Sequence, residues 1–506
     1  MNIRSKIKRA AIGVTTLLMI PALMLALLPA NAGALSLGIN LITTGPTPPG
    51  TGGDDNSQRP SISADGTKIV FWSRATDLIP GTTTSGNTQI YLYDTVTNTT
   101  KLITAGPSGT ESNNTENYPY NAISADGSKI AFMSNATDLV GAPTSGGTNI
   151  FLYDIATSTT TLVTAGPTGT GVGLNGYWGI SISANGSKIT FDTQSDNLVG
   201  AETDGNDTNI FLYDVTTGTT TLVTKGGGLM GGDGGSHQPT ISADGSKIVF
   251  SSRASDLVAG VTSNVIVNVF LYDVATDSTT LITKGPSPYV GSDNPDDGRA
   301  TDISADNNLI VFSSHATNLI NGVTANGNRN VYLYNVATGV TTLITAGASG
   351  VGGDRNSFPA SISANGSVIG FSSDATDLIA GETTDGSAQN VFTYEVASGK
   401  IELVTKGSSG IGGNYDSRRP TFSASGCTMT FHSYATDLIA GLTTNSNSNI
   451  FAFARCLEPT TGPEMPNAGY FGKPSSDTVI ATLLPALSLI LLASGIAVAS
   501  KKFTKR

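Results

Sequence analysis

Residues 242–273 read SADGSKIVFSSRASDLVAGVTSNVIVNVFLYD, and this stretch decides the fold because near copies of it recur along the chain. In the other copies, the position of Phe250 is taken by Phe71, Phe132, Phe191, Phe312, Phe371 and Phe431. The steps between successive copies are 61, 59, 59, 62, 59 and 60 residues. So constant a period is the signature of a repeat architecture, in which each copy forms one supersecondary unit.

Each copy has the apolar pattern of short β-strands. In the first copy, the segments rich in β-branched and aromatic residues are 60–63, 68–71, 89–93 and 101–104. The turn Ala64-Asp65-Gly66 joins the first two as a tight hairpin, with glycine supplying the positive φ. Four antiparallel strands per repeat are typical of a propeller blade, whereas solenoids of this period are mostly helical. We therefore predict an all-β fold, a seven-bladed β-propeller over residues 36–456.

The two ends of this repeat region predict how the ring closes. The seventh copy stops after residues 449–453 and lacks the final Thr-Thr-Leu-Ile-Thr strand of the other copies. Residues 39–46, INLITTGP, read like residues 100–107, TKLITAGP. We expect the strand Ile39–Thr44 to complete the last blade, which removes the open edges that an unclosed sheet would present.

The chain has two cysteines, and both fall in the seventh copy. Cys427 begins the second strand of that blade and Cys456 follows its third strand. In an antiparallel pair the start of one strand faces the end of the other, so we expect a disulfide between them. Two thiols alone do not make a structural zinc site, which takes four ligands.

The repeat resembles a known family. The Ser-Ala-Asp-Gly-Ser-Lys core with Asn-Val-Phe-Leu-Tyr-Asp downstream is similar to the TolB-type, WD-repeat-like propeller repeat and its Ser-Pro-Asp-Gly-Lys signature. This chain has alanine in place of that proline, and a long Thr/Gly-rich loop between its second and third strands. The resemblance implies a propeller that serves as a binding platform. Some relatives carry a separate catalytic domain, for which this chain has no room.

Composition limits the class of protein and of partner. Of 506 residues, 60 are glycine, 22 are proline and only 13% are charged, which excludes a long-helix or coiled-coil protein. Eight of the 27 basic residues lie at the two ends, so the body carries 19 against 38 acidic residues. We therefore do not expect nucleic acid as a partner.

The ends of the chain have the patterns of export and anchoring. Residues 1–32 combine a basic start, an apolar stretch and the exit Ala30-Asn31-Ala32, which predicts a signal peptide; an uncleaved membrane anchor is the alternative. Residues 478–500 are apolar and long enough for a transmembrane helix, and residues 501–506 form a basic cytoplasmic tail. We expect the body on the extracellular face of the cell envelope.

Residues 457–477 form a Pro/Gly-containing stalk with the motif Met465-Pro466-Asn467-Ala468-Gly469. The order of motif, apolar span and basic tail resembles the LPxTG sorting signal of Gram-positive surface proteins, with Met and Ala in place of Leu and Thr. The resemblance implies that a sortase thiol attacks the Ala468 carbonyl and joins the body to the cell wall. A permanent single-span anchor explains the span and tail equally well.

Signals for catalysis or metal binding are weak. G-x-S-x-G, H-E-x-x-H and P-loop motifs do not occur, so we predict no catalytic residues and no cofactor. Asp54-Asp55-Asn56 and the Asp/Asn-rich stretches 204–207 and 293–297 offer oxygen ligands for Ca²⁺, but none has EF-hand spacing, and a solvated loop is the alternative. Asp77, repeated at the same place in most copies, is expected to cap a turn.

The candidate ligand face is the side of the ring with long loops, because function concentrates on long loops held by rigid strands. Positions there that vary from copy to copy carry cations and aromatic rings, which suit carboxylates or sugars. The candidate ligand-binding residues are Arg59, Tyr120, Trp178, His237, Arg299, Phe358, Arg418, Arg419, Arg74 and Arg253. We expect a binding or adhesion platform for a glycan, peptide or protein. The alternatives are a structural envelope protein and a glycan-active hydrolase or lyase, and pairing of these arginines with loop acids is the plain explanation of the cluster.

Overall fold

The computed structural model describes residues 35–456, except 46–50, 82–83, 107–108, 115–118, 145–146, 175–178, 200–206, 228–230, 261–265, 286–298, 323–326, 348–349, 382–383, 385 and 445. The signal peptide, the stalk with Met465–Gly469, the apolar span and the basic tail that we predict lie outside the described residues. Within the described residues, no helix has the length and apolar character needed to cross a membrane.

The described residues form seven antiparallel sheets of four strands, which we call blades 1 to 7 in chain order. Blade 1 contains β2 (Ser57–Ile62), β3 (Lys68–Ser73), β4 (Gln89–Asp94) and β5 (Thr99–Leu102). Blade 2 contains β6 (Asn121–Ile123), β7 (Lys129–Ser134), β8 (Asn149–Asp154) and β9 (Thr159–Leu162). Blade 3 contains β10 (Ile180–Ile182), β11 (Lys188–Thr193), β12 (Asn209–Asp214) and β13 (Thr219–Leu222). Blade 4 contains β14 (Ser236–Ile241), β15 (Lys247–Ser252), β16 (Asn268–Asp273) and β17 (Ser278–Leu281). Blade 5 contains β18 (Arg299–Ile303), β19 (Leu309–Ser314), β20 (Asn330–Asn335) and β21 (Val340–Leu343). Blade 6 contains β22 (Ser357–Ile362), β23 (Val368–Ser373), β24 (Asn390–Glu395) and β25 (Lys400–Leu403). Blade 7 contains β26 (Ser417–Phe422), β27 (Thr428–Ser433), β28 (Asn449–Ala454) and β1 (Gly38–Leu41).

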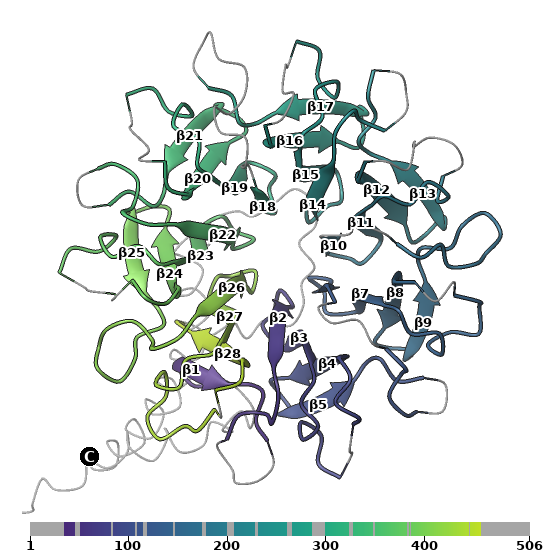
Figure 1. Ribbon diagram of the computed structural model, residues 1–506, viewed down its shortest axis with the longest axis horizontal. Helices are drawn as coiled ribbons and strands as arrows, with labels where there is room; N and C mark the ends of the chain where they lie inside the picture. Colours follow the sequence, from purple (N-terminus) through teal and green to yellow (C-terminus); the bar gives the residue numbers. More distant parts are fainter. Residues whose placement is uncertain are drawn as a thin grey trace, which may run out of the picture. The chain divides into compact units, whose positions relative to one another are not determined.

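The blades surround an axis, with the first strand of each blade innermost (Figure 1). The predicted seven-bladed propeller of four-stranded antiparallel blades is therefore confirmed. The predicted closure is confirmed as well, because β1 pairs with β28 from Gly38 opposite Ala454 to Leu41 opposite Phe451. The closing strand ends earlier than the predicted Ile39–Thr44, and beyond it Ile42 N–H donates to Ile450 O over 2.9 Å.

The repeated phenylalanine packs the middle of every blade. In each blade it stacks on an aromatic ring of the third strand, with ring centroids 5.5 to 5.9 Å apart. Phe250 on β15 and Phe270 on β16 are one such pair, and both are fully buried. Stacked aromatic pairs contribute beyond the area that they bury, which explains why this position does not vary between copies.

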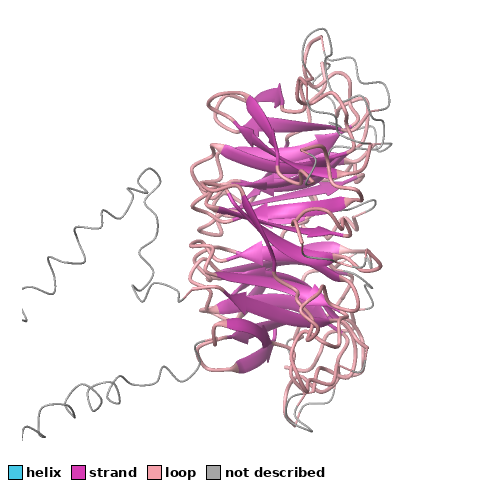
Figure 2. Ribbon diagram, turned by 90° about the vertical axis from the view of Figure 1, so that its left-hand side faces the viewer, coloured by secondary structure: helices cyan, strands magenta, loops and turns pink. Residues whose placement is uncertain are grey.

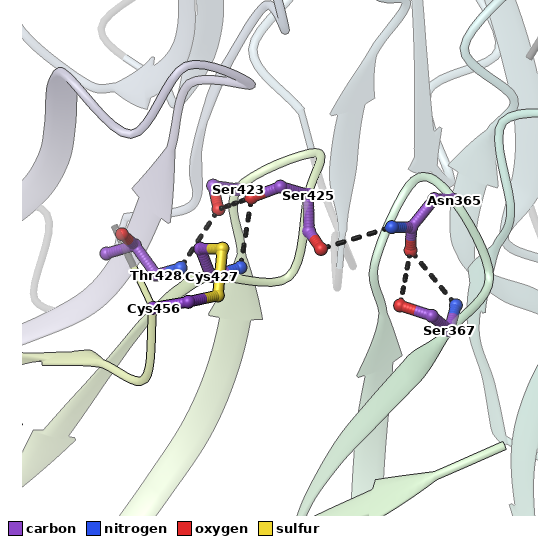
Figure 3. Close-up of a disulfide and its surroundings, with 7 residues drawn as sticks. All are labelled: Asn365, Ser367, Ser423, Ser425, Cys427, Thr428 and Cys456. Atoms are coloured by element: carbon purple, nitrogen blue, oxygen red, sulfur yellow. Dashed lines mark hydrogen bonds between the residues drawn. A yellow bond between two sulfur atoms is a disulfide. The ribbon is translucent and has the colours of Figure 1, made fainter. Parts of the chain in front are cut away.

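The two predicted cysteines form a disulfide, Cys427–Cys456, with Cα atoms 4.8 Å apart (Figure 3). Cys427 lies directly before β27 and Cys456 follows β28, so the bond joins the two middle strands of blade 7. Beside it, Asn365 Nδ2 of the blade 6 turn donates to Ser425 O of the blade 7 turn over 3.1 Å (Figure 3).

The strands run from one face of the ring to the other, and the two faces differ (Figure 2). On the short-turn face, the Ser-Ala-Asp-Gly turns of neighbouring blades are joined by backbone hydrogen bonds. Examples are Ala64 N–H to Ala125 O, Ala184 N–H to Ala243 O and Ala424 N–H to Ala64 O. Proline has no N–H to donate, so alanine in place of the family's proline allows these bonds between blades.

Loops meet on the opposite, long-loop face. Thr76 N–H donates to Asp54 Oδ1 over 2.6 Å, and Asp54 N–H donates to Asp77 Oδ1 over 3.1 Å. The same arrangement recurs with Asp354 and Asp377. Asp77 therefore joins two neighbouring loops, an architectural role that is wider than the capping of a single turn.

Candidate functional site

The innermost strands of five blades carry a β-bulge, and in three of them one residue of the bulge has a positive φ. At these bulges Arg59, Gln238 and Arg419 have φ values of 54°, 54° and 56°. Each precedes a proline, and both a positive φ and the following proline make this conformation unfavourable for a residue with a side chain. Bulges and backbone strain of this kind concentrate at functional sites.

Two of the bulged residues approach one aromatic ring. The Arg59 guanidinium carbon lies 3.6 Å from the centroid of the Tyr120 ring, and that of Arg419 lies 6.0 Å from it. Both distances are in the range of cation–π contacts. Arg59 comes from β2 of blade 1, Arg419 from β26 of blade 7, and Tyr120 precedes β6 of blade 2.

Arg418 and His432 complete this group, which we call the seam cluster: Arg59, Tyr120, Arg418, Arg419 and His432. Arg418 lies opposite His432 across the β26–β27 pair. Arg418 also forms an ion pair of 2.6 Å with Asp416. The cluster lies where the last blade meets the first, and β2 and β26 are neighbours at the axis (Figure 1).

His432 reports the electrostatics of the seam cluster. Its side chain is only 3% exposed, and its Nδ1 has no hydrogen-bond partner within the described residues. Burial, and then the positive charges of Arg419, Arg418 and Arg59, hold the pKa of His432 well below its usual value. The imidazole is therefore neutral, and the electrostatic potential at this point of an acidic protein is positive.

Between blades 3 and 4, a carboxylate occupies the corresponding place. Asp192 is fully buried, and its Oδ1 accepts Gly179 N–H over 2.9 Å while its Oδ2 accepts Gln238 N–H over 3.0 Å. His237 Nδ1 lies 3.8 Å from Asp192 Oδ2. Asp192 thus bridges the innermost strands of two blades.

A second carboxylate bridges blades 5 and 6. Asp302 Oδ1 accepts Ile303 N–H over 2.9 Å, and Oδ2 accepts Ile362 N–H over 3.0 Å. Burial raises the pKa of Asp302 to about 7, although these two hydrogen bonds oppose the shift. Other blades use serine at this place, since Ser61 Oγ accepts Ile123 N–H over 3.1 Å and Ser181 Oγ accepts Ile241 N–H over 3.2 Å. Asp302 therefore has a structural role.

The structure brings four of the predicted ligand residues together: Arg59, Tyr120, Arg418 and Arg419. His237 and Phe358 lie at the same level of the ring in other blades, opposite Ser251 and Ser372. Arg74 and Arg253 follow the second strands of their blades. Arg74 Nε donates to Thr88 Oγ1 over 3.1 Å, and Arg253 N–H donates to Gly235 O over 3.0 Å.

Trp178 and the side chain of Arg299 lie outside the described residues, so their place in the candidate site stays a prediction. Within the described residues, no group of three or more His, Cys, Asp or Glu side chains could hold a metal ion.

The sequence did not identify Asp192, Gln238 or the role of His432. The sequence did contain one signal of the bulges: Arg59, Gln238 and Arg419 each precede a proline at the same place in the repeat. A bulge is where proline is tolerated within a sheet.

No family model and no curated protein matches the sequence. Several solved structures resemble the ring. The β-propeller domain of the Trilobed protease from Pyrococcus furiosus has 11% identity and a TM-score of 0.47, over 79% of this chain and 95% of that one. Oligogalacturonate lyase from Vibrio parahaemolyticus has 13% identity and a TM-score of 0.46, over 83% and 97%. TolB from Acinetobacter baumannii has 15% identity and a TM-score of 0.36, over 73% and 77%. At these identities the likeness concerns the fold alone, and no ligand or reaction of those proteins is carried over to this chain.

Proposed function

We propose that the ring is a non-catalytic binding module that takes an anionic group of a glycan, peptide or protein partner on its long-loop face. The observation that carries the proposal is the seam cluster, in which the positive charges of three arginines act on a neutral, buried imidazole. Guanidinium groups bind carboxylates through paired, charge-assisted hydrogen bonds. An acidic protein that concentrates cations at one place has the charge to bind an anion there.

Pairing with acids inside the protein accounts for part of this cluster. Asp416 neutralises Arg418, and Asp416 also accepts Gln389 N–H over 2.8 Å. Arg59 and Arg419 lie near the Tyr120 ring, on strained bulges. We therefore assign the binding role to these two side chains and a supporting role to Arg418.

We further propose that the ring is displayed on the outer face of the cell envelope. The patterns of residues 1–32, 465–469 and 478–500 support export followed by attachment, either by a retained span or by a sortase. A disulfide in blade 7 agrees with an oxidising compartment. Membrane-fraction recovery of the intact chain would favour the retained span, and release of a product ending at Ala468 would favour the sortase.

A glycan-active hydrolase or lyase is the second candidate. Asp302 favours it, because a carboxyl group with a pKa of about 7 can donate a proton near neutral pH. Both Asp302 oxygens already accept backbone hydrogen bonds, however, which suits a structural carboxylate better. Turnover of an acidic oligosaccharide by the protein, and its loss in Asp302→Asn, would establish the enzyme instead.

Calorimetric titration of the full-length chain with paired acidic and neutral oligosaccharides and peptides tests the binding proposal. We expect an acidic member to bind, and Arg59→Ala and Arg419→Ala each to weaken it at least tenfold. Lys188→Ala is the matched control, because Lys188 Nζ donates to Gly245 O on the short-turn face. Absence of binding by every acidic probe would favour a structural envelope protein.

A further inference from the structure

We propose that the Cys427–Cys456 disulfide is a mechanical clamp, which takes up tension that enters the ring through the C-terminal segment and so keeps the ring closed under load. The clamp goes beyond the proposed binding function. It would serve an attached ring, but the path of the load follows from the strands and bonds of blade 7 alone.

The C-terminal segment leaves the ring from the strand on which closure depends. β28 ends at Ala454, and it lies between β27 on its inner side and the closing strand β1 on its outer side. Among the described strands, β28 is the one that pairs with β1. If β28 were pulled out of blade 7, β1 would lose its partner strand and the ring would open at the seam.

The exit lies on the short-turn face. Ala454 is opposite Thr428, the first residue of β27, and opposite Gly38, the first residue of β1. Thr428 comes shortly after the turn of residues 423–426, which belongs to that face. A pull away from this face therefore runs along β28, and a sideways pull lifts β28 from the end that carries Ala454. In both directions the first hydrogen bonds under load are those of β28.

In the other blades a covalent link continues past this point. Their third strand runs through a short turn into the fourth, as in blade 3, where β12 ends at Asp214 and β13 begins at Thr219. In blade 7 the fourth strand comes from the start of the chain, so no turn joins it to β28. The disulfide lies at the corresponding place and joins the end of β28 to the start of β27. Single hydrogen bonds are weak, whereas this link is covalent, so β28 cannot slide out past β27.

Beyond Cys427 the load reaches both neighbouring blades. Cys427 N–H donates to Ser425 Oγ over 3.0 Å, within the short turn of blade 7 (Figure 3). Ser425 O accepts Asn365 Nδ2 of blade 6 over 3.1 Å, and Ala424 N–H donates to Ala64 O of blade 1 over 2.9 Å. The turn is thus held from both sides. Through the disulfide, tension is shared among blades 6, 7 and 1 and is not carried by β28 alone.

Single-molecule force spectroscopy of the full-length chain tests the clamp. One handle is attached to the C-terminus and the other to an azide-bearing residue in place of Ala259, an exposed position in the long loop of blade 4. We expect the disulfide-bonded ring to unfold at no less than twice the force needed for the double variant Cys427→Ser, Cys456→Ser. The double variant should also show an early extension as residues 434–456 are drawn out, up to about 80 Å at roughly 3.5 Å per residue. The intact disulfide prevents this step, because it closes residues 427–456 into a loop.

A second pulling direction separates a clamp from general stabilisation. With handles at Ala259 and at Val96, which is 53% exposed in the short turn between β4 and β5, tension does not enter through the C-terminal segment. Here we expect the disulfide-bonded chain and the double variant to give similar first unfolding forces. The same fractional loss of force in both directions would make the disulfide a general stabilising bond and would overturn the clamp.

Asn365→Ala tests the load path beyond the disulfide. It removes the hydrogen bond to Ser425 O and should lower the unfolding force of the disulfide-bonded chain when it is pulled through its C-terminus. Asn185→Ala, at the same place in the blade 3 turn, is the matched control. Both asparagines accept a serine N–H over 3.0 Å, from Ser367 and from Ser187, but only Asn365 contacts the turn that carries the disulfide. Equal effects of the two variants would contradict load sharing through blade 6.

The decisive comparison is the pull through the C-terminus. Equal unfolding forces with and without the disulfide would refute the clamp. If the double variant does not fold, reduction of the folded chain with dithiothreitol gives the same comparison in the unmodified cysteines. These measurements use neither a ligand nor attachment to a cell, so the clamp and the proposed binding function can fail independently.

Discussion

Thr43 Oγ1 donates a hydrogen bond of 2.9 Å to Asn449 Oδ1, although 406 residues separate them in the sequence. Thr43 Oγ1 also accepts Ile450 N–H over 3.0 Å. In blade 3, whose strands are consecutive, Thr224 makes the same two bonds with Asn209 and Ile210, over 2.9 Å and 3.0 Å. The last blade is thus built like the others, with its fourth strand taken from the start of the chain.

Because Thr43 and Thr224 make the same hydrogen bonds, we expect their removal to lower the stability of the protein by similar amounts. Thr43→Ala should lower the free energy of unfolding by about 1–3 kcal/mol, because buried groups lose their partner, and Thr224→Ala should lower it by a similar amount. Urea unfolding of both variants checks this. If Thr43→Ala kept full stability while Thr224→Ala lost it, the closing strand would be dispensable.

The disulfide should stabilise the blade that the two ends of the chain build together. Its cysteines are 29 residues apart, and cross-links of this kind contribute about 2–4 kcal/mol. Cys427→Ser combined with Cys456→Ser should lower the denaturant midpoint accordingly, and mass spectrometry of the unreduced chain should find the joined peptides. Two free thiols in the unreduced chain would contradict the pairing.

The alanine of the Ser-Ala-Asp-Gly turn gives a test of contact between blades. Ala424→Pro removes the N–H that donates to Ala64 O and should cost about 1 kcal/mol. Ala125→Pro is the comparison, because in blade 2 Asp126 N–H donates to the next blade, at Ala184 O. The two variants should differ in thermal stability, and equal losses would mean that the bond at Ala424 contributes nothing.

Asp302 predicts a pH dependence of stability. Its pKa is raised to about 7 in the folded protein, so the folded state binds the proton more tightly than the unfolded chain, where aspartate titrates near about 4. This contribution to stability is present below about pH 4 and is lost as pH rises to about 7. Asp302→Ser should keep a side-chain acceptor for Ile362 N–H, as Ser61 and Ser181 do for their neighbours, and should remove this slope. An unchanged slope in Asp302→Ser would assign it to other groups.

The fold could be predicted from the sequence because every copy repeats the same strand pattern and the same turn residues. The spacing of Phe250 and its counterparts, the tight Asp-Gly turns and the displaced strand near Ile39 are all visible in one dimension. The bounds of the closing strand were less predictable, because its regular register with β28 ends at Leu41, while single hydrogen bonds at Ile42 and Thr43 continue the contact.

The candidate site was only partly predictable. Variation between copies identified Arg59, Tyr120, Arg418 and Arg419, but also Arg74, which lies one strand further out. Equivalence in sequence does not show which neighbours converge. The convergence depends on the bulges, which turn Arg59 and Arg419 toward Tyr120, and on the seam that joins the two ends of the chain.

Hydrogen exchange of the full-length chain, with and without the acidic oligosaccharide or peptide that binds it most tightly, is the most direct test of ligand binding at the seam, on the long-loop face. We expect slower exchange in residues 57–62 and 417–422, and no change in the equivalent residues 236–241 or in the turns at 64–66 and 424–426. Protection centred on blade 4 or on the short-turn face, or no protection at any residue, would contradict it.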